Sequence, residues 1–189
     1  KGIRDIIVGD YVEPSPCIKI YRKNIVNNLR MPPDIKINED VIFNFYAFVN
    51  SQKSVYEDLP FYHYILRKGS AATSKINQNK LFDPVIVRKE IFEYSLKNLD
   101  NEIQSVAYSS YLNSIINLYR VVSNSKLKEY KEDSFILKRQ IKEIKGNFML
   151  SKRVKTERFL FFHCTGLLMF AYKIYDNFLS KNTNKYEVK

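Results

Sequence analysis

The chain has 189 residues, and its 31 lysines and arginines exceed its 20 aspartates and glutamates, which gives a formal net charge of +11. Hydrophobic residues make up 45% of the sequence, too much for intrinsic disorder, and the 5 glycines and 6 prolines exclude collagen-like and glycine-rich chains. The length suits one domain or one lobe of a larger domain. Cys17 and Cys164 make no disulfide framework, which favours a reducing, cytosolic environment.

Residues 1–80 are expected to form mixed α/β structure. An apolar run over residues 3–8 is consistent with a strand or a short helix. Two further segments, residues 54–56 and 61–67, are rich in β-branched and aromatic side chains and are predicted to be strands.

Helices are predicted where apolar residues recur at spacings of three and four, as Val41, Phe45 and Phe48 do. Asp83-Pro84 has the composition of a helix start, with Asp as the N-cap and Pro at the first helical position. The expected helices cover residues 22–29, 39–49, a segment from Asp83, a segment from Asp100, residues 134–148 and residues 151–179.

Residues 81–189 are therefore expected to form an all-α C-terminal region, and the chain is expected to be mostly helical overall. The most apolar part of this region is Phe159–Tyr172. Its 14 residues fall short of the roughly 18–20 that span a bilayer, so no transmembrane helix is predicted. His163-Cys164 within this stretch is interpreted as a core or interface pair.

The positive charge is concentrated in residues 126–158, which contain 11 basic and 5 acidic side chains. About half of the net charge therefore lies in this stretch. Such a patch suits an anionic partner: nucleic acid, a phosphorylated sugar donor or an acidic membrane face. The alternative is a helical surface whose lysines are simply solvated.

Few residues suggest a metal site or a nucleophile. Cys17, His63, His163 and Cys164 show no zinc-ligand spacing. The sequence contains no glycine-rich phosphate loop, no serine or cysteine triad signature and no recognised RNA-binding motif, so nucleic acid is not expected as a partner. Carboxylates such as Glu39-Asp40 at a helix start are also common because they complement the helix dipole.

Between residues 15 and 75, short motifs follow one another in a recognisable order: Lys19-Ile20-Tyr21-Arg22-Lys23, Leu29-Arg30-Met31-Pro32, Glu39-Asp40-Val41-Ile42-Phe43-Asn44, Leu59-Pro60-Phe61-Tyr62-His63-Tyr64 and Arg67-Lys68-Gly69-Ser70. This order resembles the C-terminal half of bacterial family 2 glycosyltransferases. The basic helical tail is similar to that of capsule and cell-wall polysaccharide transferases. The resemblance implies that residues 1–80 are the acceptor-side part of a GT-A catalytic domain, with a fragment of its Rossmann-like sheet.

The resemblance also implies a reaction: transfer of a sugar, with inversion, from a nucleotide-sugar donor to a hydroxyl of a glycan or lipid-linked acceptor. Asp40 matches the family's general base. A carboxylate in this role takes the proton of the acceptor hydroxyl as the new C–O bond forms. Glu39 would orient the acceptor or support the loop.

The substrate-binding residues implied by the resemblance are Lys19, Arg67 and Ser70, which would lie near the donor diphosphate. Cations there would stabilise the departing nucleotide. His63 would be a neighbour of the metal or the diphosphate. A divalent metal, Mn²⁺ or Mg²⁺, is implied for the complete enzyme, with ligands mostly outside this chain and no metal ligand assigned within it.

The sequence departs from the family pattern in two respects. Cys17 and Ile18 stand where the family has Trp and Asn or Gly, which affects acceptor preference. No Pro-x-Tyr-Asn strand and no Asp-x-Asp motif precedes Lys1, so the donor-binding half is not found. The chain by itself is therefore expected to have little or no transferase activity.

The alternative function is a non-catalytic helical module that docks on a membrane or a partner. It would use the basic stretch and the apolar last helix to bind anionic lipid, another protein or a second copy of the chain. An exposed sheet edge would also invite self-association. Both interpretations predict a cytoplasmic protein, with a peripheral location on the inner face of the membrane if the tail docks there.

Overall fold

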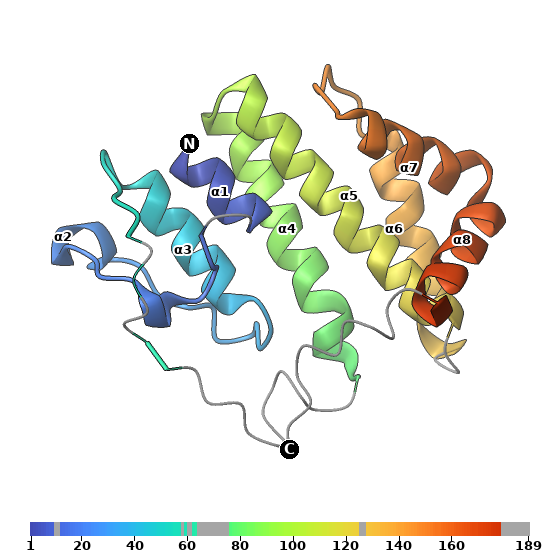
Figure 1. Ribbon diagram of the computed structural model, residues 1–189, viewed down its shortest axis with the longest axis horizontal. Coiled ribbons are helices and arrows are strands. Elements are labelled where there is room, and N and C mark those ends of the chain that lie inside the picture. Colours follow the sequence, from blue (N-terminus) through green and yellow to red (C-terminus); the bar gives the residue numbers. More distant parts are fainter. Residues whose placement is uncertain (10–11, 58, 60–61, 64–75, 125–127, 179–189) are drawn as a thin grey trace. The chain divides into compact units, whose positions relative to one another are not determined.

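The computed structural model describes residues 1–9, 12–57, 59, 62–63, 76–124 and 128–178, and within these ranges all regular structure is helical. The elements, labelled in Figure 1, are α1 (Gly2–Val8), η1 (Pro16–Ile18), α2 (Lys23–Val26), α3 (Glu39–Val49), α4 (Gln78–Asn98), α5 (Asn101–Asn124), η2 (Lys128–Tyr130), α6 (Lys131–Glu143), α7 (Lys152–His163) and α8 (Thr165–Phe178). The chain divides into two compact units, Lys1–Ser110 and Tyr111–Lys189, with the boundary inside α5.

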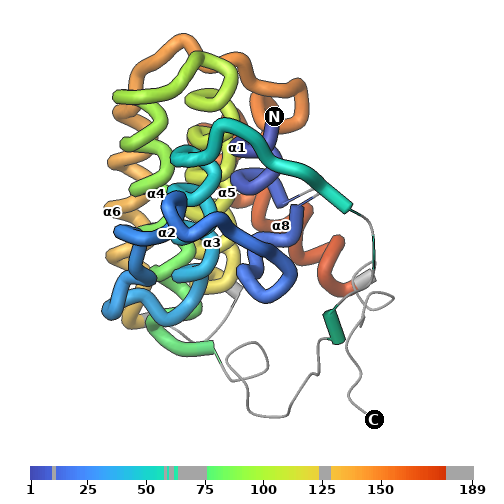
Figure 2. The backbone as a smooth tube through the Cα atoms, turned by 90° about the vertical axis from the view of Figure 1, so that its left-hand side faces the viewer, coloured from blue at the N-terminus to red at the C-terminus, as the bar shows by residue number. Residues whose placement is uncertain are grey.

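In the first unit, α3 is the central helix. It packs against α1 and α4, while α2 lies on the side of α3 away from α4 (Figures 1 and 2). Most of the side chains that α1, α3 and α4 bury are apolar, among them Ile6, Ile7, Val41, Ile42, Phe45, Val87 and Ile91. Burial of apolar surface is the main force that holds such a helix group together.

In the second unit, the buried Phe161 of α7 is the central side chain. Its ring meets the edge of the Tyr119 ring from α5, with 5.5 Å between centroids, and Tyr119 makes the same kind of contact with Phe135 of α6. Helix α8 packs against α7. Asp176 of α8 forms a bidentate ion pair with Arg120 of α5, in which Nε and Oδ2 are 3.0 Å apart.

The expected α/β fold of residues 1–80 is wrong, because the described residues contain no strand and no sheet. Residues 54–56 are irregular and exposed. A strand needs a neighbouring strand for its backbone hydrogen bonds, and β-branched composition alone does not supply one. Of the second expected strand, only Tyr62 and His63 lie within the described residues, and both are irregular.

The prediction of a helical C-terminal region is confirmed for residues 81–124 and 128–178, the part of it that the structure describes. The helix over residues 39–49 is confirmed at both ends, and so is the cap at Asp100, whose Oδ1 accepts a hydrogen bond from the Ile103 N–H at 2.9 Å. The expected helix start at Asp83-Pro84 is wrong. Helix α4 begins at Gln78, where the side chain of Asn77 caps it, and Pro84 lies inside the helix.

The long helix expected over residues 151–179 is also wrong, because the chain turns at Cys164 between α7 and α8 (Figure 1). The Cys164 N–H closes α7 on the Leu160 carbonyl at 2.8 Å, and the Cys164 carbonyl accepts the first hydrogen bonds of α8. Helices α2 and α6 are shorter than expected. Among the described residues, no helix is long and apolar enough to cross a membrane.

Candidate functional site

Asp40, the predicted general base, lies in the first turn of α3. The helix follows Asn38, whose φ of 69° is left-handed, a conformation that Asn tolerates better than most residues. The loop before the helix is held by the buried Asp83 of α4, whose Oδ2 accepts the N–H groups of Lys36 at 2.8 Å and Ile37 at 3.0 Å. This anchor fixes where α3 begins and therefore where Asp40 lies.

The segment before α2 is fastened to α3 through the buried Asn44. The Asn44 amide donates to the Pro14 carbonyl, and its oxygen accepts the hydroxyl of Tyr21. The Tyr21 ring also meets the edge of the Phe43 ring, with 5.9 Å between centroids. These contacts bring a stretch that is 23 to 30 residues earlier in the chain to the middle of α3.

As a result, Lys19 lies close enough to Asp40 for the two charges to interact. The charge of Asp40 acts on Lys19 in the direction that raises its pKa, but burial is the larger effect and lowers it. The Lys19 ammonium donates to the carbonyls of Glu13 and Ser15, the second at 2.7 Å. Lys19 therefore holds this loop in shape as well as placing a positive charge near Asp40.

Arg88 of α4 is a further member of the site, which the sequence analysis did not identify. Its Nη1 donates to the Ile7 carbonyl at 3.0 Å, at the end of α1. Burial lowers the pKa of Arg88, and the carboxylate of Asp40 acts in the opposite direction. No local signal could have revealed Arg88, because its neighbours come from segments far away in the sequence.

The carboxylate of Asp40 is half-buried, and this burial raises its pKa above the ordinary value. Four groups oppose the rise: the Val41 N–H, which donates to Oδ1 at 2.8 Å, the backbone N–H of Asp40 itself, and the charges of Lys19 and Arg88. Burial outweighs them. Asp40 is therefore a stronger base than an exposed aspartate would be.

The charge of Asp40 also acts on the pKa of two other groups, Tyr21 and Cys17. Burial, helped by Asp40 and Cys17, raises the pKa of Tyr21 to about 12. The exposed Cys17 thiol has a pKa below its ordinary value because the side chains of Ser15 and Tyr62 form hydrogen bonds with it. We call Cys17, Lys19, Tyr21, Asp40 and Arg88 the Asp40 cluster.

The remaining predicted site residues are not all brought to this cluster. Glu39 is the first residue of α3 and is half-buried. His63 is exposed. Arg67 and Ser70 lie outside the described residues. Within the described part of the chain, no group of three His, Cys, Asp or Glu side chains could hold a metal ion, so these residues do not fit a metal site.

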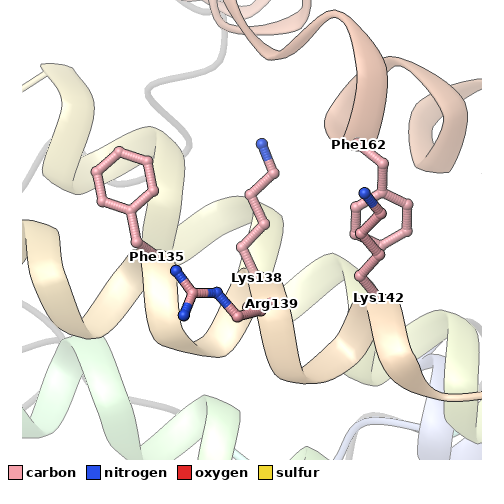
Figure 3. Close-up of a pocket in the computed structure, with 5 residues that line it drawn as sticks. All are labelled: Phe135, Lys138, Arg139, Lys142 and Phe162. Carbon is pink, nitrogen blue, oxygen red and sulfur yellow. The ribbon is translucent and has the colours of Figure 1, made fainter.

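A second polar region lies in the second unit, where three basic residues of α6 line a groove of about 290 Å³. They are Lys138, Arg139 and Lys142, and the groove is completed by the rings of Phe135 and Phe162 (Figure 3). The Lys138 ammonium lies 4.8 Å from the centroid of the Phe161 ring. Burial and the charge of Lys142 lower the pKa of Lys138. We call this feature the basic groove.

No protein-family model matches the chain, and no curated protein and no solved structure matches it. Inference about function therefore depends on the order of the motifs in the sequence and on the geometry of the Asp40 cluster and the second unit.

Proposed function

We propose that this chain is part of a family 2-like inverting glycosyltransferase and that Asp40 is its general base. The observation that carries the proposal is the state of Asp40: a half-buried carboxylate with a raised pKa in the first turn of α3, beside Lys19. Lys19 and Asp40 belong to two different motifs of the resemblance, and in the folded chain each charge acts on the other.

The proposed reaction is a single displacement. Asp40 takes the proton of the acceptor hydroxyl while that oxygen forms a bond to the anomeric carbon of the donor sugar. The bond between this carbon and the diphosphate oxygen breaks at the same time, and the nucleoside diphosphate leaves with the electron pair. The products are the extended glycan, the nucleoside diphosphate and a proton on Asp40. A raised pKa suits this role, because a weakly basic carboxylate removes the proton less effectively.

The other members of the Asp40 cluster would position the base. Lys19 and Arg88 limit the rise of the pKa of Asp40 that burial causes. Lys19 also donates to the Glu13 and Ser15 carbonyls and so holds the loop before α2. The described residues do not fit the divalent metal that the resemblance implies, and no step of the proposed reaction is assigned to such an ion here.

The test introduces Asp40→Asn into the full protein that the cell produces. The assay measures the transfer of labelled sugar from nucleotide-sugars to bacterial membrane glycans. Asn keeps an oxygen for the Val41 N–H but cannot accept the proton. We expect the rate to fall by about 10² to 10⁴. Asp34→Asn, at an exposed position in the loop before α3, is the matched control and should leave the rate unchanged.

Transfer by Asp40→Asn at the rate of the unaltered protein would refute the assignment of the base. A second expectation concerns the 189-residue chain, which should show little or no transfer when purified alone, since the motifs of the donor-binding half are not found in it. Turnover by this chain alone would contradict that part of the proposal.

A further inference from the structure

Helix α8 has an apolar stripe that the rest of the described chain leaves uncovered. Its members follow the spacing i, i+3, i+4, i+7, i+8 along one face, which is the pattern of an amphipathic helix. They are Leu167, Phe170, Ala171, Ile174 and Tyr175, and we call them the α8 stripe. Leu167 is 59% exposed, Phe170 61%, Ile174 44% and Tyr175 50%.

The opposite face of α8 makes the contacts that hold the helix in the second unit. Leu168 is buried, and Tyr172 lies 4.9 Å from the guanidinium of Arg120. Asp176 pairs with the same arginine. These contacts hold α8 in the second unit, and the α8 stripe takes no part in them.

Cations of α6 and α7 lie close to α8. At its first residue, the Lys138 ammonium of the basic groove donates to the hydroxyl of Thr165, which is on the packed side of the helix with Leu168. Further along α8, Tyr172 and Tyr175 are close enough to the guanidinium of Arg153 to interact with it electrostatically.

Two acidic side chains of α7 and α8 are paired with cations. Asp176 is paired with Arg120, and Glu157 with Arg153, whose Nε lies 3.0 Å from its Oε1. The charge excess of residues 126–158 remains on α6 and α7, the second of which packs against α8, and their exposed cations include Lys131, Arg139, Lys142, Lys152 and Lys155.

We propose that the α8 stripe and the cations of α6 and α7 dock this chain on an anionic lipid bilayer. The stripe would lie in the plane of the interface with its apolar side chains among the acyl chains, while the cations contact the headgroups. With 14 residues, α8 has the length of a helix that lies on a membrane and not of one that spans it.

Charge and composition favour this occupant over the others. A second copy of the chain would bring a surface of the same positive sign against the stripe, and like charges oppose such contact. A nucleic acid would satisfy the cations but would leave five apolar residues exposed. An anionic bilayer satisfies both features. The inference does not depend on the proposed transferase activity, and its test does not measure that activity.

The first experiment is flotation of the 189-residue chain with vesicles of phosphatidylcholine alone and with vesicles containing one quarter phosphatidylglycerol. We expect binding to the anionic vesicles only, and a decline of that binding as salt rises from about 0.1 M to about 1 M, where the screening length falls from about 10 Å to about 3 Å. The double variant Phe170→Ser, Ile174→Ser should bind at least about tenfold more weakly.

A matched control is Ile86→Ser on α4, which removes an isolated apolar residue that is 49% exposed and should leave binding unchanged. The double variant Arg139→Gln, Lys142→Gln tests the charges and should weaken binding by about fivefold for each cation removed. Far-UV circular dichroism of each variant confirms that the helices are retained.

The outcomes are separable. Equal binding to both kinds of vesicle, or no binding to either, overturns the proposal. If the chain instead forms a dimer in solution that Phe170→Ser, Ile174→Ser abolishes, and does not bind anionic vesicles, the stripe is a self-association surface and the proposal is wrong. Loss of transferase activity in Asp40→Asn with vesicle binding retained would support both proposals independently.

Discussion

Replacement of Asp83 by alanine should destabilise the loop before α3, which fixes the position of Asp40. Asp83 is 4% exposed, and its Oδ2 accepts the N–H groups of Lys36 and Ile37. Hydrogen bonds to a charged group contribute about 1.5–3 kcal/mol each, so two of them set an upper range of about 3–6 kcal/mol. Because Lys36 is exposed and its N–H can bind water instead, we expect Asp83→Ala to lower the free energy of unfolding by about 2–4 kcal/mol.

Urea unfolding followed by far-UV circular dichroism measures this loss, and hydrogen exchange at the Lys36 and Ile37 amides locates it. Asp83→Asn keeps one oxygen for both N–H groups and should cost about 1–2 kcal/mol, since neutral acceptors bind about half as strongly. Asp34→Ala, at an exposed position in the same loop, should stay within about 0.5 kcal/mol of the unaltered chain. If Asp83→Ala unfolded at the same urea concentration as Asp34→Ala, the anchoring role of Asp83 would be refuted.

Pro84 lies inside α4 and has no N–H to donate to the helix. Pro84→Ala should therefore raise the free energy of unfolding by about 1–2 kcal/mol. No change, or a decrease, would mean that the helix starts at this residue. Burial raises the pKa of Asp40, so the folded state holds its proton more tightly, and its carboxyl favours folding most at low pH and loses this effect as pH rises through the folded pKa. Asp40→Asn should therefore gain stability relative to the unaltered chain as the pH rises from the ordinary pKa of an aspartate, about 4, through the raised pKa of Asp40. Parallel stability curves against pH would contradict the direction of that pKa shift. Asp176→Ala breaks a bidentate ion pair with Arg120 and should lower the free energy of unfolding in urea by about 1 kcal/mol. Glu157→Ala, whose partner Arg153 is mostly exposed, should lower it by less than about 0.5 kcal/mol. Equal losses would show that the bidentate pair is no more stabilising than the exposed one.

The elements that the sequence predicted best are those whose signals are local. Helix α3 has its apolar spacing and its acidic first turn within 11 residues, and Asp100 caps α5 through its own side chain three residues away. Such signals depend on neighbours along the chain, and sequence analysis can find them. The electrostatic interaction of Lys19 with Asp40 was not predicted from the sequence, where the two residues belong to separate motifs of the resemblance.

The failures have the opposite origin. Asp83 has the composition of an N-cap, but its carboxylate is used 46 residues away, by the Ile37 N–H. Arg88 joins the Asp40 cluster from α4, and nothing near it in the sequence indicates a site. The strand expected at residues 54–56 would have needed a partner strand, and the described residues supply none.

The contact between Arg88 and the end of α1 has a consequence for the order of folding during synthesis. Helix α1 has only seven residues, too few to be stable alone, and its Ile7 carbonyl is satisfied by a guanidinium 81 residues later in the chain. A nascent chain that has not yet released α4 from the ribosome therefore has an α1 segment that cannot stay helical. We expect α1 to be cleaved by proteases in such nascent chains and to become protected only when α4 emerges.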